Sequence, residues 1–238
     1  MVILAIDTSG KRGGVALSRG HAAGFTVIGE RSIESGGYSA RLMPSITELL
    51  RDADVHKEQL EGFVVASGPG AFTGLRVGIA TVKALAEALR RPLAAISALE
   101  LVASKALRPG ERVVAALDAG RKEVYAGLYA ASAEQEWPTC NTEFLASLDE
   151  LKRWVETNCP DAAVVTPDEA IVTAMRGLGS ATQVPYPGAA DLAAAGWRRL
   201  RAGITAPVAE LDANYIRRSD AEIFSLTAGP PRPGVPSR

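Results

Sequence analysis

Residues 67–78, SGPGAFTGLRVG, are the most informative stretch of the chain. They follow a short apolar run at residues 63–66 and open a segment with helical periodicity, which predicts a strand, a glycine-rich turn and a helix N-terminus. Such a turn exposes free backbone N–H groups and is able to hold an anion. The helix that follows is poor in bulky side chains, which favours close packing by a second helix. The turn therefore predicts either a ligand site or a packing surface.

The composition is that of a packed globular protein without a strong charge. The chain has 238 residues and 47% of them are apolar, enough for one large domain or two lobes. The formal net charge is −1, which argues against autonomous binding to nucleic acid. Cys140 and Cys159 form neither a disulfide framework nor a metal-ligand spacing. Because no secretory leader or membrane-spanning run is found, we expect a reduced, cytoplasmic protein.

Apolar runs and helical periodicities alternate through the first half of the chain. The apolar face of residues 39–53 lies opposite a charged face, which predicts an amphipathic helix with Ser39 as its N-cap. Residues 73–90 predict a second helix, capped by Thr73 and stopped by Pro92. The other predicted elements are strands at 2–6, 14–18, 25–33, 63–67 and 93–97 and a helix at 98–106.

The second half begins as the first does, with an apolar strand that ends in aspartate. Residues 113–118 (VVAALD) repeat the pattern of residues 2–7 (VILAID) at an offset of 111 residues, which suggests an internal duplication. We therefore expect two lobes, at 1–107 and 108–228, and a disordered tail at 229–238 that is rich in Pro and Gly. The second lobe is expected to contain strands at 113–118, 124–129 and 162–166 and helices at 147–157 and 189–202.

Asp7 and Asp118 end their predicted strands, where α/β folds place ligand sites. Either they hold a metal-bound nucleotide, or they only cap the following turns through Asx-type hydrogen bonds. The glycine-rich turn is a weak phosphate signal, because a P-loop needs Lys and a hydroxyl residue where Leu75 and Arg76 follow Gly74. No paired-histidine metal site and no nucleophile elbow is found in the sequence.

Small residues run down the helix predicted at 73–90. They are Gly74 and Gly78 on one stripe and Ala80, Ala84 and Ala88 on another. Such rows let a neighbouring element approach closely, and that neighbour is either the chain's own sheet or a partner protein. If it is a partner, we expect Gly78→Leu to block binding and leave the monomer folded.

Together these segments resemble the TsaB (YeaZ) family, the bacterial accessory proteins of tRNA threonylcarbamoyladenosine synthesis. The resemblance covers most of residues 1–220, and its block GPGxFTGLR is specific. It rests on residues 3–9 (ILAIDTS), 38–44 (YSARLMP), 67–76 (SGPGAFTGLR), 117–119 (LDA), Arg121, 123–125 (EVY) and 214–217 (NYIR).

The resemblance implies a two-lobed α/β fold of the ASKHA type (actin/sugar-kinase/Hsp70-like, ribonuclease H-like), with duplicated sheet-and-helix lobes. It implies a non-catalytic subunit that works with the catalytic paralogue TsaD and the ATPase TsaE. The complex forms N6-threonylcarbamoyladenosine at position 37 of tRNAs reading ANN codons. The resemblance further implies a homodimer in isolation, contact with tRNA only through the complex, no membrane association and no intrinsic cofactor or metal. ATP or ADP at the partner interface is a hypothesis that it leaves open.

The family's partner surface is formed by its first two helices, which match 39–53 and 73–90 here. The interface residues implied are Tyr38, Ser39, Leu42, Met43, Ile46, Leu49, Phe72, Thr73, Gly74, Arg76, Val77, Gly78 and Thr81. A vestigial nucleotide site is implied at Asp7, Thr8 and Asp118.

The chain departs from the family pattern beside these helices. The family usually has His-Ser-Glu where residues 38–40 are YSA, and Ser where Ala71 stands, so details of the interface are expected to differ. The competing hypothesis is an ATP-dependent small-molecule kinase of the same fold, with Asp7 and Asp118 near the nucleotide. Its support is limited to the glycine-containing segments 10–14 (GKRGG) and 120–122 (GRK).

Overall fold

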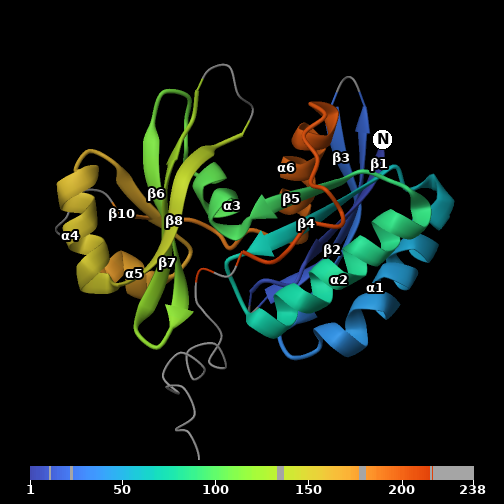
Figure 1. Cartoon of the computed structure of the whole chain (residues 1–238), viewed down its shortest axis with the longest axis horizontal. Helices are drawn as coiled ribbons and strands as arrows, with labels where there is room; N and C mark the ends of the chain where they lie inside the picture. Colours follow the sequence, from blue (N-terminus) through green and yellow to red (C-terminus); the bar gives the residue numbers. More distant parts are fainter. Residues whose placement is uncertain (11, 22–23, 133–136, 177–180, 215, 217–238) are drawn as a thin grey trace, which may run out of the picture.

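The computed structural model describes residues 1–10, 12–21, 24–132, 137–176, 181–214 and 216. These residues form two lobes that stand side by side, each built on one mixed sheet of five strands (Figure 1). Among the described helices, none combines the length and the apolar character needed to cross a lipid bilayer. The α/β architecture with two related lobes confirms the fold class expected from the sequence.

The sheet of the first lobe, the N-lobe, is built around a fully buried central strand. Its strand order is β3-β2-β1-β4-β5, and β1 pairs antiparallel with β2 and parallel with β4. All six residues of β1 are buried, as its continuous apolar run requires. The strands are β1 (Val2–Asp7), β2 (Arg12–His21), β3 (Gly24–Glu34), β4 (Gly62–Gly68) and β5 (Leu93–Ser97).

The sheet of the second lobe, the C-lobe, repeats this topology. Its order is β8-β7-β6-β9-β10, with antiparallel pairs on one side of β6 and parallel pairs on the other. Because β6 takes the place of β1, the two strands that end in aspartate are equivalent, and the expected duplication is confirmed. The strands are β6 (Arg112–Gly120), β7 (Glu123–Ala130), β8 (Thr139–Ser147), β9 (Ala163–Thr166) and β10 (Ala181–Gln183).

The helices cover both faces of each sheet, and two of them cross between the halves of the sequence. Helices α1 and α2 cover one face of the N-lobe sheet and α6 covers the other (Figure 1). Helices α4 and α5 cover one face of the C-lobe sheet, and α3 packs mainly on the other. The helices are α1 (Tyr38–Asp52), α2 (Phe72–Leu89), α3 (Ala98–Ser104), α4 (Leu148–Asn158), α5 (Glu169–Ala174) and α6 (Ala189–Arg201), and a 3₁₀ turn spans Lys57–Gln59.

The predicted division at 107/108 therefore separates the sheets but not the helices. Helix α3, from the first half, lies on the C-lobe sheet, and α6, from the second half, lies on the N-lobe sheet. The physical reason is that both faces of a mixed sheet must be covered, and the helix that does so need not be its neighbour in the sequence. The tail predicted at 229–238 lies outside the described residues.

Both predicted N-caps are wrong. Helix α1 is capped at Gly37 and α2 at Ala71, neither with a side-chain hydrogen bond. The Ala71 N–H donates to the Ser9 carbonyl oxygen at 2.7 Å, so a turn distant in the sequence determines where α2 begins. The sequence also missed β8, α5 and β10, of which the last two have only 6 and 3 residues.

Three glycines let α2 and its preceding turn lie directly on the turn after β1. A Cβ on Gly70 would overlap the Ser9 carbonyl oxygen. One on Gly74 would overlap the Thr8 carbonyl oxygen, and one on Gly78 the Thr8 hydroxyl. The glycine stripe therefore faces the chain's own turn at Thr8 and Ser9. A leucine at position 78 would overlap Thr8, so the structure does not support the expectation that Gly78→Leu leaves the monomer undisturbed.

We expect Gly74→Ala to lower the free energy of unfolding by about 1–3 kcal/mol, the usual cost of overpacking. Helix propensity alone predicts the opposite sign, about 1 kcal/mol in favour of alanine. The sign of the change in unfolding free energy therefore tests whether residue 74 packs against the Thr8 carbonyl oxygen. Urea denaturation measures the unfolding free energy of Gly74→Ala and of a control variant, Ala80→Leu. Residue 80 is exposed on the same helix, so the control is expected to change stability by less than about 0.5 kcal/mol. A stabilised Gly74→Ala variant would contradict the packing.

Candidate functional site

A cleft of about 350 Å³ opens between the lobes, at the carboxyl ends of β1 and β6. Its walls come from the turns after β1 and β4, from α3 and from the C-lobe. Both strand-ending aspartates, Asp7 and Asp118, line it. The duplicated topology therefore brings the two carboxylates to one cavity, at the place where α/β folds bind ligands.

Asp7 is a buried carboxylate that shapes its own turn. Its Oδ1 accepts hydrogen bonds from the Ser9 N–H at 2.9 Å and the Ser9 hydroxyl at 2.7 Å. Burial raises the pKa of Asp7, and the two bonds from Ser9 oppose that rise. The Asx-type cap, one of the two interpretations that the sequence left open, is thus present at Asp7.

Thr8 faces away from the cleft. It is fully buried beneath α2, beside Gly74 and Gly78, and its hydroxyl has no hydrogen-bond partner among the described residues. It does not line the cavity. Its assignment to a vestigial nucleotide site is therefore wrong, because the close approach of α2 covers it.

Asp118 is exposed and belongs to a hydrogen-bonded group on the C-lobe wall. Its Oδ1 accepts from the Gly120 N–H at 2.8 Å, and its own N–H donates to Asp168 Oδ2 at 2.8 Å. The Tyr186 hydroxyl donates to the other oxygen of Asp168. Burial, together with the carboxylates of Asp168 and Asp118, raises the pKa of Tyr186, and Arg12 opposes this shift.

The sequence missed Asp168 and Tyr186. Asp168 lies two residues after the end of β9. Ligand sites of α/β folds lie at the carboxyl ends of strands, and this rule could have identified Asp168 from the sequence. Tyr186 stands in an irregular segment before α6 and has no periodic pattern around it.

The cleft offers acceptors rather than charged donors. Three aspartates line it, and among the described lining residues the one cationic side chain is Arg12. The described residues also contain no cluster of His, Cys, Asp and Glu that could hold a metal ion. A phosphate chain needs lysines, backbone amides or a bound cation to neutralise it. The lining is thus poorly suited to nucleotide phosphates.

The residues expected at the partner interface divide into a buried and an exposed group. The buried group faces the N-lobe interior and consists of Tyr38, Leu42, Ile46, Leu49, Gly74 and Gly78. As direct partner contacts these six are wrong, because their helical spacing marks the core face of each helix. The Tyr38 hydroxyl donates to the Gly10 carbonyl oxygen at 2.8 Å, and burial raises its pKa to about 12.

The exposed group lies on the outer face of the same two helices. Met43 is 49% exposed and is one of four large hydrophobic side chains that are exposed among the described residues. The Arg76 guanidinium lies 3.8 Å from the centre of the half-buried Phe72 ring, and Val77 and Thr81 are also half-buried. We define the helix-pair surface as the exposed residues Ser39, Met43, Thr73, Arg76, Ala80, Ala84 and Ala88.

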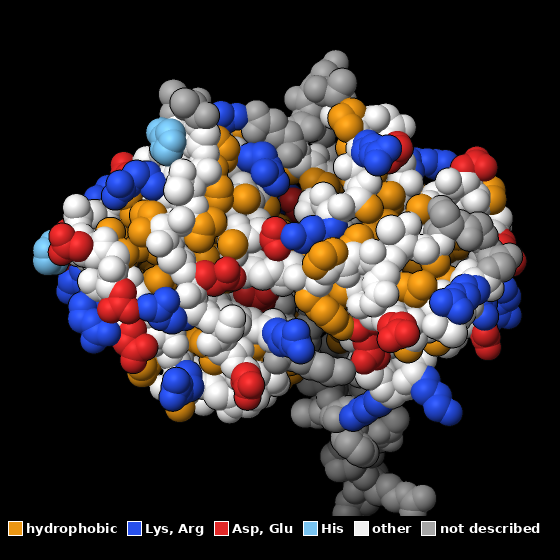
Figure 2. All heavy atoms as spheres, turned by 180° about the vertical axis from the view of Figure 1, so that it is seen from behind, with side chains coloured by type: hydrophobic (Ala, Val, Ile, Leu, Met, Phe, Trp, Pro, Cys, Tyr) orange, Lys and Arg blue, Asp and Glu red, His pale blue; other side chains and the backbone are white. Residues whose placement is uncertain are grey.

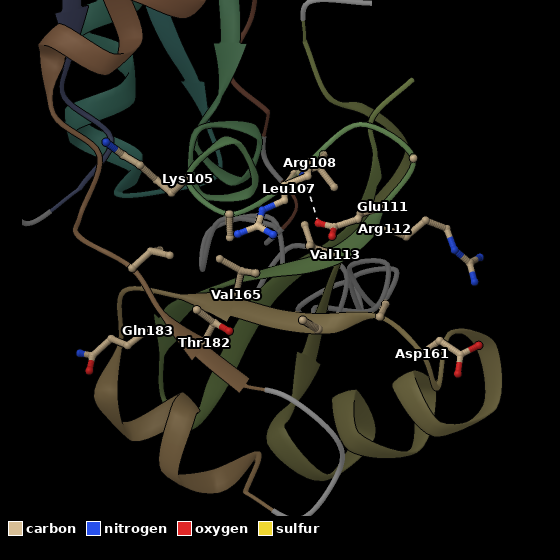
Figure 3. A pocket seen from close by; sticks show the side chains of 15 residues that line it. Lys105, Leu107, Arg108, Glu111, Arg112, Val113, Asp161, Val165, Thr182 and Gln183 are labelled. Atoms are coloured by element: carbon tan, nitrogen blue, oxygen red, sulfur yellow. Dashed lines mark hydrogen bonds between the residues drawn. The ribbon is translucent and has the colours of Figure 1, made fainter. Parts of the chain in front are cut away.

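A wider hollow of about 900 Å³ lies at the C-lobe beyond the end of α3 (Figure 3). Val113 and Val165 line its apolar part, while Arg112 and Asp161 extend outward on one side of it and Gln183 on the other. Binding and catalysis need polar groups that converge on one point. This hollow therefore has volume without the arrangement of a chemical site.

The face of the molecule opposite to that of Figure 1 has mixed charge. Figure 2 shows acidic and basic side chains interspersed over both lobes, with apolar side chains between them. Autonomous binding to nucleic acid needs lysine and arginine gathered on one face. Among the described residues of this face, no such gathering is seen.

We expect Asp7→Asn to raise the thermal unfolding midpoint at pH 7 and to leave it nearly unchanged at pH 3. Burial raises the folded-state pKa of Asp7 above the ordinary value of 3.8, so the folded state binds the proton more tightly and stability falls as the pH rises through the folded pKa. Asparagine keeps an acceptor for Ser9 without the charge. Asp161→Asn, at an exposed carboxylate, is the matched control and should change neither midpoint. A lower midpoint for Asp7→Asn at pH 7 would show instead that the ionised carboxylate stabilises the turn.

Comparison with known proteins agrees with the fold. Residues 32–166, more than half of the chain, match the family described as "TsaD: tRNA N6-adenosine threonylcarbamoyltransferase". YeaZ from Pseudomonas aeruginosa superposes with a TM-score of 0.72 at 29% identity, over 90% of this chain and 99% of that one.

Sequence relatives point the same way. The "tRNA threonylcarbamoyladenosine biosynthesis protein TsaB" of Bacillus subtilis (strain 168) is 41% identical over 130 residues, 54% of this chain and 55% of that protein. The chain thus matches about half the length of this curated relative. An uncharacterized protein of Mycobacterium tuberculosis (strain ATCC 25618 / H37Rv) is 30% identical over 94% of this chain and 95% of its own length. With the duplicated lobes and the glycine-packed turn, these matches show that the chain belongs to the TsaB (YeaZ) family.

Proposed function

We propose that the chain is a non-catalytic scaffold and activator subunit in the formation of N6-threonylcarbamoyladenosine at position 37 of tRNAs reading ANN codons. TsaD is its direct partner, TsaE joins the assembly, and tRNA is contacted only through the complex. The names of the TsaB relatives and the match to the TsaD family support the pathway. The acceptor-rich cleft, with its poor fit to nucleotide phosphates, supports the non-catalytic role.

The helix-pair surface is the observation that carries this proposal. An exposed apolar side chain, Met43, lies on α1, and exposed alanines run along α2, where they leave room for another helix to approach. The C-lobe has no equivalent among its described helices, because α5, the counterpart of α2, has 6 residues against 18. Of the two counterpart helices, only α2 of the N-lobe is therefore long and has a row of small exposed side chains.

The same surface also accounts for a homodimer in isolation. Two copies that meet through one patch form an isologous contact with twofold symmetry. Homodimer and TsaD heterodimer would then compete for the helix-pair surface. ATP or ADP bound at the partner interface, rather than as an intrinsic cofactor, is the nucleotide role that this proposal includes.

We expect Ala84→Trp to weaken binding to purified TsaD by about tenfold or more, equivalent to about 1.4 kcal/mol, because the indole holds the partner helix away. Ala84 is exposed, so the monomer should remain folded by circular dichroism. Ala170→Trp, at an exposed position of α5, is the matched control and should bind TsaD as the unmodified chain does. Calorimetric titration measures the TsaD affinity of both variants. An unchanged affinity of Ala84→Trp would show that TsaD does not bind at the helix-pair surface.

The second candidate is an ATP-dependent small-molecule kinase, favoured by the cleft that Asp7 and Asp118 line. Titration of the isolated chain with ATP and magnesium separates the two functions. The scaffold role predicts no measurable heat of binding. Tight, magnesium-dependent binding that Asp118→Asn abolishes would favour the kinase.

A further inference from the structure

A polar network joins the two lobes at a place distinct from the cleft and from the helix-pair surface; within it Tyr129 is buried, Ser97 and Glu143 are half-buried and Asn214 is exposed. Its centre is Glu143 of β8. Glu143 accepts hydrogen bonds from the hydroxyls of Ser97, at the end of β5, and Tyr129, in β7. Its second oxygen accepts from the Asn214 side-chain amide at 2.5 Å. One carboxylate therefore connects the N-lobe sheet, the C-lobe sheet and the segment after α6.

That segment, residues 206–214, is here called the strap. It is anchored along the N-lobe, where the Ala206 N–H donates to the Leu93 carbonyl oxygen at 2.8 Å. Farther along, the Lys83 ammonium of α2 donates to the Leu211 carbonyl oxygen at 2.9 Å. The strap is thus held by β5 and by one of the two helices that form the helix-pair surface.

The last residue of the strap contacts both the glycine-rich turn and the network. The Asn214 N–H donates to the Ser67 carbonyl oxygen at 2.7 Å, next to Gly68, where a Cβ would lie 3.1 Å from the Asn214 carbonyl oxygen. Its side chain meanwhile binds Glu143. Asn214 therefore connects Glu143 to the backbone that leads into α2.

A second carboxylate, Glu100 of α3, lines the same hollow as Tyr129 and Glu143. Glu100 is only 5% exposed, and one of its oxygens accepts from the Arg199 guanidinium of α6 at 2.6 Å. The other oxygen has no hydrogen-bond partner among the described residues. Burial raises the pKa of Glu100 to about 7, Arg199 lowers it, and the charge of Glu143 raises it further.

The charged groups around Glu100 lie on some of the elements that pack on α3 and not on others. Strands β4, β5 and β9, which also pack on α3, contain no ionisable side chain within their bounds. The ionisable groups on the other elements around α3 are Asp191, Arg198, Arg199 and Arg201 on α6, Glu143 and Cys140 on β8, Glu123, Tyr125 and Tyr129 on β7, and Arg112 and Asp118 at the two ends of β6. Asp191 is paired with Lys105, the residue after α3, at 2.6 Å. Ionised Glu100 is therefore opposed chiefly by Glu143 and compensated chiefly by Arg199.

We propose that Glu100 and Glu143 form a proton-controlled latch between the lobes, and that this latch sets how firmly the strap holds the glycine-rich turn. When Glu100 is neutral, Glu143 is the one charged carboxylate of the pair, and its three donors hold the lobes and the strap together. When Glu100 is ionised, Glu100 and Glu143 are both negatively charged, and Arg199 is the main cation that compensates them. Their repulsion weakens the bonds to Glu143 and loosens Asn214. An effect on TsaD binding through α2 would rest in addition on the proposed function, whereas the latch itself does not.

Hydrogen exchange of the Asn214 and Ala206 amides, followed by NMR on the full chain and corrected for intrinsic rates, tests the latch without any partner. With a pKa of about 7 when closed and an ordinary value of 4.5 when open, linkage predicts about tenfold lower protection at pH 8 than at pH 6. Glu100→Gln should remove this pH dependence. Glu169→Gln, at an exposed glutamate of α5, is the matched control and should retain it.

Variants of the network complete the test. Glu143→Gln should lower protection of the Asn214 amide at both pH values and leave the β1 amides protected. Should that variant fail to fold, Tyr129→Phe removes a single donor and should lower protection to a smaller extent. Protection that is equal at pH 6 and pH 8 in the unmodified chain, or a pH dependence that persists in Glu100→Gln, would overturn the proposal. Because no partner is present, either result leaves the scaffold role untouched.

Discussion

The backbone contact between α2 and the turn after β1 is the constraint on which the functional surface depends. Gly70, Gly74 and Gly78 allow this contact because a Cβ at any of them would overlap the turn at Thr8 or Ser9. The glycine face of α2 is thereby held against the protein, while Ala80, Ala84 and Ala88 of the same helix are exposed. The motif that first suggests a phosphate cradle is therefore a packing device, and the proposed partner surface is its consequence.

The two lobes share one topology but are not independent. Each sheet is completed by a helix from the other half of the sequence, α3 on the C-lobe and α6 on the N-lobe. Apart from this exchange of helices, equivalent parts of the two lobes differ. Asp7 is buried and Asp118 is exposed, and the long α2 corresponds to the short α5. The network at Glu143 lies at the same junction, where the lobes already depend on each other for their packing.

Sequence patterns predicted the central strands, which have a continuous run of buried residues. The central strands β1 and β6 are continuous apolar runs because they are covered on both faces, and such runs are easily recognised. Helical spacing likewise identified the residues that share one face of α1. The resemblance to the family, which matches whole helices and not single faces, placed buried Leu42 and exposed Met43 alike at the interface.

The parts that the sequence could not predict depend on distant contacts. The start of α2 is set at Ala71 by a hydrogen bond to Ser9, and no local preference encodes that bond. Asp168 and Glu143 acquire their roles from partners far away in the chain, Tyr186 and Asn214 among them. Single polar residues of this kind have no period, so only the folded arrangement reveals them.

The most direct test of the central claim is hydrogen–deuterium exchange of the chain alone and mixed with TsaD. The account predicts that TsaD slows exchange in residues 38–52 and 72–89, the two helices that carry the helix-pair surface. The cleft segments around Asp118 and Asp168 should exchange as they do in the isolated chain. Protection of these cleft segments, with α1 and α2 unchanged, would contradict the account.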